Sequence, residues 1–250
     1  NMLVLDGGGA MTYLTSKLEG LGYRWAYRLV DSRFTGVPQR RHRVILVACR
    51  DGDPRRVLFA DDRKMPDLSG RRFHDDAFGF YWTEGLTGLG WAQDGVPPLK
   101  GGSSIGIPSP PAVWLPSEVP GEKIRTPSIE GAERMQGFPA GWTRAAEKDG
   151  KRSARWKLVG NAVSVGVGEW VGKRLLEPGD VVVESELMRS IERWPDAAYG
   201  ESGNVYRFDA SQWPTLDSKI VHLRPLLDRH GSTPLSERAV KGFLERVGRS

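Results

Sequence analysis

The sequence predicts an α/β fold with a loop-rich region inserted into it. Residues 1–50 alternate apolar runs with a helical pattern, and 124–176 return to the same texture. Between them, 51–123 is dense in glycine and proline with interleaved tryptophans, so regular structure is expected to be sparse there. The tail, 177–250, is divided by prolines and is expected to form short helices that wrap a surface. We take these four ranges as the expected domain organisation.

The first fifty residues are expected to hold three strands and one helix. Leu3–Leu5 is a short apolar run that predicts a buried strand. A helix is predicted next, with apolar residues at helical spacing from Ala10 to Leu21. Tyr23–Val30 is rich in aromatic and β-branched residues, which favours a strand. Arg43–Ala48 reads RVILVA and predicts a fully buried strand.

Two helices are expected in the second α/β stretch. Ile129–Gln136 predicts a short helix, with Ser128 as its N-cap and Gly137-Phe138-Pro139 as its stop. Gly160-Asn161 is expected to precede another helix, whose apolar face would hold Val163, Val167, Val171 and Leu175.

Composition narrows the class of protein. The 250 residues contain 36 Lys+Arg and 31 Asp+Glu, a net charge of +5 that permits a polyanionic partner without requiring one. No apolar run approaches the roughly 20 residues of a membrane span, and no signal peptide opens the chain. We therefore expect a cytoplasmic protein with no membrane partner. Cys49, the one cysteine, excludes disulfides, and the four histidines share no ligand spacing, so no metal is expected.

Three segments carry the chemistry. In Gly36–Val44, a strand period would place Gln39, Arg41 and Arg43 on one face, which suits a site for a phosphate and a polar base edge. A solvated basic strand end is the alternative. In Arg125–Pro139 nothing is reactive, so the expected role is scaffolding.

The third segment, Gly160-Asn161-Ala162-Val163, would expose backbone N–H groups at a helix start. Such groups favour an anionic or polar ligand, although Gly-Asn before a helix is also an ordinary cap.

These collinear segments resemble the C-terminal half of DNA (cytosine-5)-methyltransferases. GVPQRRHRVILVA is similar to the family's PQRR segment, RTPSIEGAERMQGFP to its QGFP segment, and GNAVSVGVGEWV to its GNAV segment. The family places a variable target-recognition domain where 51–123 lies. The resemblance covers residues 1–176, and PLSERAVKGFLERV in the tail is similar to an appended region of some members. It implies the C-terminal part of a Rossmann-like sheet that uses S-adenosylmethionine, plus a small loop-rich target-recognition domain.

The resemblance also implies that part of the machinery lies elsewhere. In the family, a thiolate from a Pro-Cys loop attacks C6 of a flipped-out cytosine, and S-adenosylmethionine then methylates C5. Cys49 stands in Val-Ala-Cys-Arg without a Pro-Cys context, so we expect a core thiol. The nucleophile and the main cofactor pocket are expected from an N-terminal half, either a separate subunit or missing sequence. The chain is then expected to be inactive alone.

Site residues follow from the same resemblance. Arg43 would contact the flipped cytosine near O2, Arg41 would hold the site and the target phosphate, and Gln39 would line the DNA side. The cofactor would be closed over by Gly160, Asn161, Ala162 and Val163, with Ala162 where many members have Ser. Another departure is Pro98-Leu99 where many have Thr-Leu.

Double-stranded DNA is the expected partner, and several basic residues are expected to contact it. Those in the first segment, in the recognition region and in the basic run 148–157 are the candidates for phosphate contacts. They are Arg40, Arg71, Arg72, Lys100, Arg152 and Arg155. Trp82 and Trp91 are expected to pack a small core rather than stack on DNA.

Two other hypotheses remain open. One is a DNA-binding module without catalysis, either a remnant or a regulator. The other is an independent Rossmann enzyme that uses Gly7–Gly9 as a nucleotide loop, with Asp31 as the acidic residue after the next strand. Against it, the loop lacks the full G-x-G-x-x-G spacing.

Overall fold

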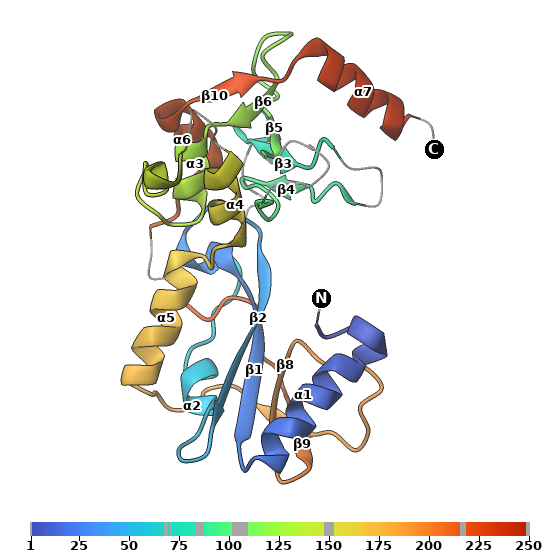
Figure 1. Ribbon diagram of the computed structural model, residues 1–250, viewed down its shortest axis with the longest axis vertical. Coiled ribbons are helices and arrows are strands. Elements are labelled where there is room, and N and C mark those ends of the chain that lie inside the picture. The colour runs from blue at the N-terminus through green and yellow to red at the C-terminus, as the bar shows by residue number, and fades with distance from the viewer. Residues whose placement is uncertain are drawn as a thin grey trace. The chain divides into compact units, whose positions relative to one another are not determined.

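The structure is a computed structural model of mixed α/β architecture with two five-stranded sheets (Figure 1). It describes residues 2–67, 70, 72–83, 88–101, 110–147, 153–215 and 219–248. The chain divides into two compact units. The first unit comprises 1–35, 42–66 and 167–218, and the second comprises 36–41, 67–166 and 219–250.

The sheet of the first unit has the strand order β2-β1-β8-β9-β7, and every neighbouring pair is antiparallel. Its central hairpin pairs Arg24 with Cys49 at one end and Asp31 with His42 at the other. Both predicted strands form, but β2 is not fully buried as predicted, because it lies at the edge of this sheet and its residues are exposed or half-buried. The strands are β1 (Arg24–Asp31), β2 (His42–Cys49), β7 (Ser185–Leu187), β8 (Ala197–Glu201) and β9 (Asn204–Phe208).

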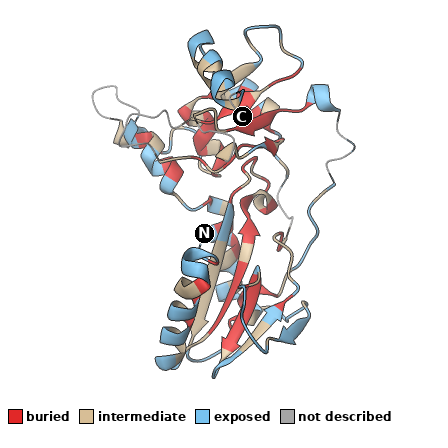
Figure 2. Ribbon diagram, turned by 90° about the vertical axis from the view of Figure 1, so that its right-hand side faces the viewer, coloured by how far each residue is buried: buried red, intermediate tan, exposed pale blue. Residues whose placement is uncertain are grey.

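Both faces of this sheet are covered. Because side chains alternate along a strand, Trp25 and Tyr27 join one apolar cluster while Ala26 and Val30 join the other. Figure 2 shows the central strands buried and the outer side of α1, beside the N-terminus, exposed. The covering helices are η1 (Leu5–Gly8), α1 (Gly9–Gly20), η2 (Ser32–Thr35), α2 (Arg55–Leu58) and α5 (Val165–Leu176), of which the part from Val167 on belongs to this unit.

A glycine in β8 makes room for the largest side chain of the core. Gly200 pairs with Trp25, and a Cβ on Gly200 would lie 2.1 Å from the indole ring. The ring packs edge-on against Trp194 at 5.9 Å, and its Nε1 donates to Glu19 Oε1 at 2.8 Å. This contact fastens α1 to the sheet.

Two predicted elements are wrong. Leu3–Leu5 forms a turn that leads into η1, and Val4 and Leu5 are exposed. Three apolar residues before glycines are too few to form a strand. The tail is not only helical, because it supplies β7, β8 and β9. Its β8–β9 hairpin turns through Ser202 and Gly203, both with positive φ, as a tight two-residue turn requires.

The Rossmann alternative also fails in this unit. No strand precedes the Gly7–Gly9 loop in the described chain, and β1 runs antiparallel to both of its neighbours. Asp31 is buried, and its carboxylate accepts bonds from Arg33 and lies 3.3 Å from His42 Nε2. Burial raises the pKa of Asp31, but the bonds from His42 and Arg33 outweigh it and lower the pKa overall. Asp31 is therefore a structural carboxylate.

The second unit contains the other antiparallel sheet, with the order β10-β6-β5-β3-β4. Since each sheet is antiparallel throughout, the described residues confirm the α/β class but not a Rossmann-like sheet. The strands are β3 (Phe78–Phe80), β4 (Ala92–Gln93), β5 (Ala112–Trp114), β6 (Ile124–Pro127) and β10 (Ser232–Pro234). The helices are η3 (Phe73–Asp75), α3 (Ile129–Met135), η5 (Arg144–Ala146), α4 (Ser153–Asn161), α6 (Leu223–His230) and α7 (Glu237–Val247).

Two apolar cores hold this unit. In one, α3 packs against α4 and α6 through buried residues such as Met135, Val159 and Leu227. The predicted N-cap is confirmed, because Gly131 N donates to Ser128 Oγ at 3.0 Å. In the other, aromatic rings replace regular structure around the short strands. Trp91 stacks on Phe78 at 5.4 Å but is 44% exposed, so its predicted role in packing a small core stays a prediction.

The described part of the chain has no helix long and apolar enough to cross a membrane. Within the same residues, no three His, Cys, Asp or Glu side chains come together as a metal site.

The contact between Gly200 and Trp25 predicts a large, local effect on stability. Gly200→Ala is expected to lower the free energy of unfolding by about 3 kcal/mol, because backbone or indole must shift. Gly168→Ala is the matched control, since its Cβ would meet nothing within 4 Å in α5 and should stabilise by about 0.5–1 kcal/mol. Urea unfolding of both variants measures the difference. Equal stabilities would contradict the packing described here.

Candidate functional site

The first predicted segment and α3 are joined by a buried glutamine of the second unit. Gln39 Nε2 donates to Met135 O at 3.0 Å, and Leu99 N donates to Gln39 Oε1 at 3.1 Å. Backbone bonds extend this contact, because Arg40 N donates to Val96 O and Val96 N donates to Pro38 O, each at 2.9 Å. Gln39 therefore ties three separate stretches of chain together and lies inside the unit. Its predicted place on the DNA side stays a prediction.

A second buried glutamine joins α3 to the residues that follow α4. Gln136 Nε2 donates to Val159 O at 2.9 Å, and Ser164 Oγ donates to Gln136 Oε1 at 2.7 Å. Val165 N also donates to Gln136 O at 2.9 Å. Sequence reasoning did not single out Gln136 or Ser164. A polar residue at the end of an otherwise apolar helix face was the available signal for Gln136.

Arg41 holds the turn between α4 and α5, which we call the α4–α5 corner (residues 160–164). The guanidinium is 6% exposed, and it donates to Ala162 O at 3.0 Å and to Gly160 O at 3.4 Å. Carbonyls at a helix C-terminus carry partial negative charge, so a buried cation is well placed there. The three predicted segments therefore meet directly within one unit.

The helix position predicted for Gly160 and Asn161 is wrong. They are the last two residues of α4, and Ala162 N donates to Leu158 O at 3.0 Å. Because α5 starts only at Val165, the argument from a helix N-terminus does not apply to this segment. The corner still presents polar and apolar groups to solvent. Asn161 is exposed, and Val163 is 64% exposed rather than packed on the predicted apolar face.

Two glycines allow the corner to lie on the backbone after Leu99. A Cβ on Gly160 would lie 2.3 Å from Gly101 N, and a Cβ on Gly101 would lie 2.6 Å from Asn161 Oδ1. Only glycine fits so close a backbone approach. Sequence reasoning missed the role of Gly101, because nothing in the spacing links it to a segment 60 residues later along the chain.

A buried carboxylate network supports the other side of α3. Glu133 accepts bonds from Gly141 N, Thr143 N and Thr143 Oγ1, and Arg155 Nη2 donates to it at 3.1 Å. Burial raises the pKa of Glu133, but the bonds from Thr143, Gly141 and Arg155 outweigh burial and lower the pKa overall. The pKa of this carboxyl group therefore lies below its ordinary value, and the group is ionised at neutral pH.

Arg155 is not available to DNA, so its predicted phosphate contact is wrong. Its guanidinium is 2% exposed and bonds Glu130, Glu133 and Glu147 at 3.0–3.1 Å. Burial lowers the pKa of Arg155, yet the bonds to Glu133, Glu147 and Glu130 outweigh this and raise it. The basic run that suggested a DNA contact supplies the cation of an internal network.

The other predicted contact residues lie in different settings. Arg43 is exposed on β2 in the first unit and donates to His42 O at 2.7 Å. Arg40 is half-buried, and Arg72 is exposed just before η3. Lys100 Nζ lies 4.1 Å from the centre of the Tyr81 ring. Arg71 and Arg152 lie outside the described residues.

Comparison with known proteins shows a similarity to DNA methyltransferases. Residues 1–76 match the C-5 cytosine-specific DNA methylase family. The chain is also 48% identical over 254 residues to Type II methyltransferase M2.BsuMI of Bacillus subtilis strain 168, which covers 99% of this chain and 64% of that protein. The chain is therefore similar to C-5 cytosine-specific DNA methylases in its first 76 residues and to a Type II methyltransferase over nearly its whole length. A further member of this group of relatives, Type II methyltransferase M.NaeI of Lentzea aerocolonigenes, is 25% identical over 188 residues.

The chain spans only part of the length of the curated relatives that it matches. It spans 64% of the length of M2.BsuMI, and the match to M.NaeI covers 67% of this chain and 45% of that protein.

The Glu133 network predicts a pH-dependent loss of stability. The folded pKa of Glu133 lies below its unfolded value of about 4.3, so the ionised carboxylate stabilises the protein above that pH and not below its folded pKa. Glu133→Gln is therefore expected to cost roughly 3 kcal/mol at pH 7. The deficit should narrow as the pH falls below about 4.

Denaturant unfolding between pH 7 and pH 3 measures this deficit. Glu169→Gln removes a carboxylate from an exposed ion pair with Lys173 and serves as the control, with a change below about 0.5 kcal/mol. A deficit that did not vary with pH would show that lost packing, not the charge, explains the effect.

Proposed function

We propose that this chain is part of a cytosine-5 DNA methyltransferase of the restriction-modification type. In the complete enzyme a methyl group would pass from S-adenosylmethionine to C5 of a flipped-out cytosine in a specific sequence of duplex DNA. The observation that carries the proposal is the direct bonding of Gln39 and Arg41 to α3 and to the α4–α5 corner. The three segments that resemble the family's motifs thus form one connected structure.

We assign different tasks to the two arginines of the first segment. Arg43 is exposed on β2, so its guanidinium is accessible to a base. In the proposal it contacts the flipped cytosine near O2. Arg41 is a positioning residue, because its buried guanidinium sets the carbonyls of Gly160 and Ala162.

The α4–α5 corner fits one wall of a cofactor site. S-adenosylmethionine has polar and apolar parts, and when bound it supplies the methyl group. The corner offers the amide of Asn161 and the exposed apolar side chain of Val163, and Leu158, just before the corner in α4, is also exposed. These residues would contact the cofactor from one side, and Gly160 would fix their place through its contact with Gly101.

The nucleophile is proposed to come from outside these 250 residues. Cys49 ends β2 and is half-buried. Burial raises the pKa of its thiol, with Arg24 offsetting this only in part, so little thiolate forms at neutral pH. An activated cysteine needs the opposite environment. We therefore propose an N-terminal half, on a separate subunit or in other sequence, that brings the thiolate and the main cofactor pocket.

The edge of the first unit's sheet supports a partner of this kind. Among the described residues β2 pairs only with β1, yet its residues are apolar toward both faces. Ile45 packs on one cluster and Val44 on the other, as in an interior strand, and all residues from Val44 to Cys49 are half-buried. The opposite edge, β7, has three exposed residues. Natural sheets rarely leave a long apolar edge uncovered, so β2 suits an added strand.

Complementation tests the proposal. Transfer of labelled methyl groups to DNA is measured for the chain alone, and then with a polypeptide that carries a Pro-Cys loop and a Gly-rich cofactor pocket. The part of M2.BsuMI that this chain does not match is the first choice for that polypeptide. Transfer is expected only in the mixture, and Cys49→Ser should leave it intact.

Two results would contradict the proposal. Transfer by the chain alone that Cys49→Ser abolishes would make Cys49 the nucleophile. DNA binding without transfer, after complementation with each such polypeptide, would favour a DNA-binding module without catalysis.

Substitutions of Arg43 and Arg41 should have different effects on kcat and Tm in the complemented enzyme. Arg43→Ala is expected to lower kcat by about 10²–10³ with no change in Tm, because the side chain is exposed. Arg41→Ala should lower both, because it leaves the carbonyls of the corner unpaired. Arg50→Ala, just after the other end of β2, is the control and should change neither. Wild-type kcat in Arg43→Ala would remove Arg43 from the site.

A further inference from the structure

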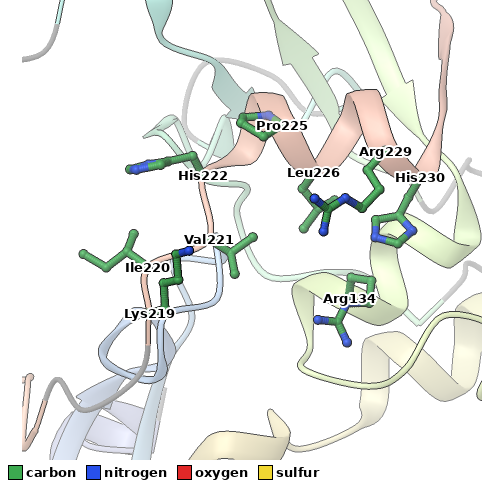
Figure 3. A pocket seen from close by; sticks show the side chains of 9 residues that line it. All are labelled: Arg134, Lys219, Ile220, Val221, His222, Pro225, Leu226, Arg229 and His230. Atoms are coloured by element: carbon green, nitrogen blue, oxygen red, sulfur yellow. The ribbon is translucent and has the colours of Figure 1, made fainter.

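A basic pocket lies in the second unit between α3, α6 and the residues that lead into α6. Its volume is about 310 Å³. Figure 3 shows the guanidinium of Arg134, from α3, and the side chains of Arg229 and His230, from α6, gathered around the same space. Lys219 contributes a further cation, and Val221 and Leu226 add apolar wall.

The carboxylates close to this pocket are engaged with other groups. Asp94 Oδ2 lies 2.6 Å from His222 Nδ1, and Leu223 N donates to Asp94 Oδ1 at 2.9 Å. Glu130, on α3, pairs with Arg155 at 3.0 Å. Arg134 Nη1 donates a hydrogen bond to Phe138 O at 3.2 Å. The cations of the pocket therefore have spare hydrogen-bonding capacity and a local excess of positive charge.

His230 responds to that excess. Burial holds the pKa of His230 below its ordinary value, and the charges of Arg134 and Arg229 lower it further. Glu130 acts in the opposite direction and offsets this only in part. An anion in the pocket would reduce the unfavourable potential. The pKa of His230 is thus a local reporter for anion binding.

We propose that this pocket binds a backbone phosphate of duplex DNA. Guanidinium groups match the geometry of phosphate oxygens and can donate to them in pairs. The apolar wall formed by Val221, Pro225 and Leu226 favours a nucleic-acid backbone over a free inorganic anion, because a deoxyribose can pack against it. The inference rests on the proposed function, which supplies duplex DNA as the ligand.

The pocket is connected to the candidate site by two short links. Val221 N donates to Gly36 O at 2.8 Å, at the start of the segment that carries Gln39 and Arg41. Arg134 immediately precedes Met135, whose carbonyl accepts from Gln39. A phosphate bound here would therefore fix DNA against the same chain segments. Such contacts position the duplex and carry no sequence information.

The test is a salt titration of DNA binding by the 250-residue chain. Arg134→Gln/Arg229→Gln is expected to weaken binding about tenfold for duplexes of any sequence, because charge-assisted bonds to one phosphate are lost. The slope of log Kd against log salt should fall by about 1. Lys173→Gln/Arg207→Gln removes the same charge from two exposed ion pairs of the first unit and should change neither value.

A second variant tests whether weaker DNA binding could be caused by a folding defect. Arg229→Glu changes one exposed side chain and leaves the bond from Arg134 to Phe138 O intact. It should weaken DNA binding more than the double Gln variant and leave thermal unfolding unchanged. NMR titration of His230 then distinguishes the source of the anion. Duplex DNA should raise its pKa, and inorganic phosphate at the same phosphate concentration should raise it much less.

The outcomes separate this inference from the proposed function. Pocket variants that match the control double variant, or a wild-type chain that does not bind duplex DNA, would overturn it. So would a His230 response to inorganic phosphate alone. Weakened DNA binding together with failed methyl transfer in the complemented enzyme would support the pocket and reject the proposed catalysis.

Discussion

Two buried glutamine amides determine whether the candidate site exists at all. Gln39 and Gln136 each donate one bond and accept one, and three of their four partners are backbone groups of distant segments. An amide is the side chain that can serve a carbonyl and an N–H at once, so a carboxylate or an apolar replacement would leave a buried group unsatisfied. The positions of the α4–α5 corner, of Leu99 and of Gly101 follow from these bonds. Arg41 then adds its charge to a geometry that the glutamines have already fixed.

The basic residues of this chain divide into an interior and an exterior set. Arg28, Arg41 and Arg155 are buried, and their guanidiniums bond carbonyls or carboxylates of the protein itself. They stabilise the two units and contribute little to the potential felt by DNA. The net charge of +5 therefore does not show where the exposed positive charge lies. In the second unit, Arg134 and Arg229 line a basic pocket beside the segment that leads to Gln39.

Sequence patterns predicted local structure well where one segment decides it. The helix after Ser128 and the strands at 24–31 and 42–49 follow from capping and composition. The β8–β9 hairpin could also have been predicted, from alternating apolar residues around Ser202-Gly203. The burial of Arg155 could not be predicted, because it depends on three carboxylates from different segments. The motifs predicted which segments form the site but not how these segments contact one another. The role of Gly101, for example, depends on its close contact with Gly160, which the sequence does not show.

The half-buried apolar edge of β2 also has a consequence for the solubility of such a chain in a cell. A strand of this kind pairs readily with another copy of itself, and edge pairing of that sort leads to aggregates. The supply of any strand that covers β2 would then limit how much of the chain remains correctly assembled. Balanced synthesis of the two would matter as much as the strength of their contact. Gene dosage, and not only affinity, would set the level of the correctly assembled chain.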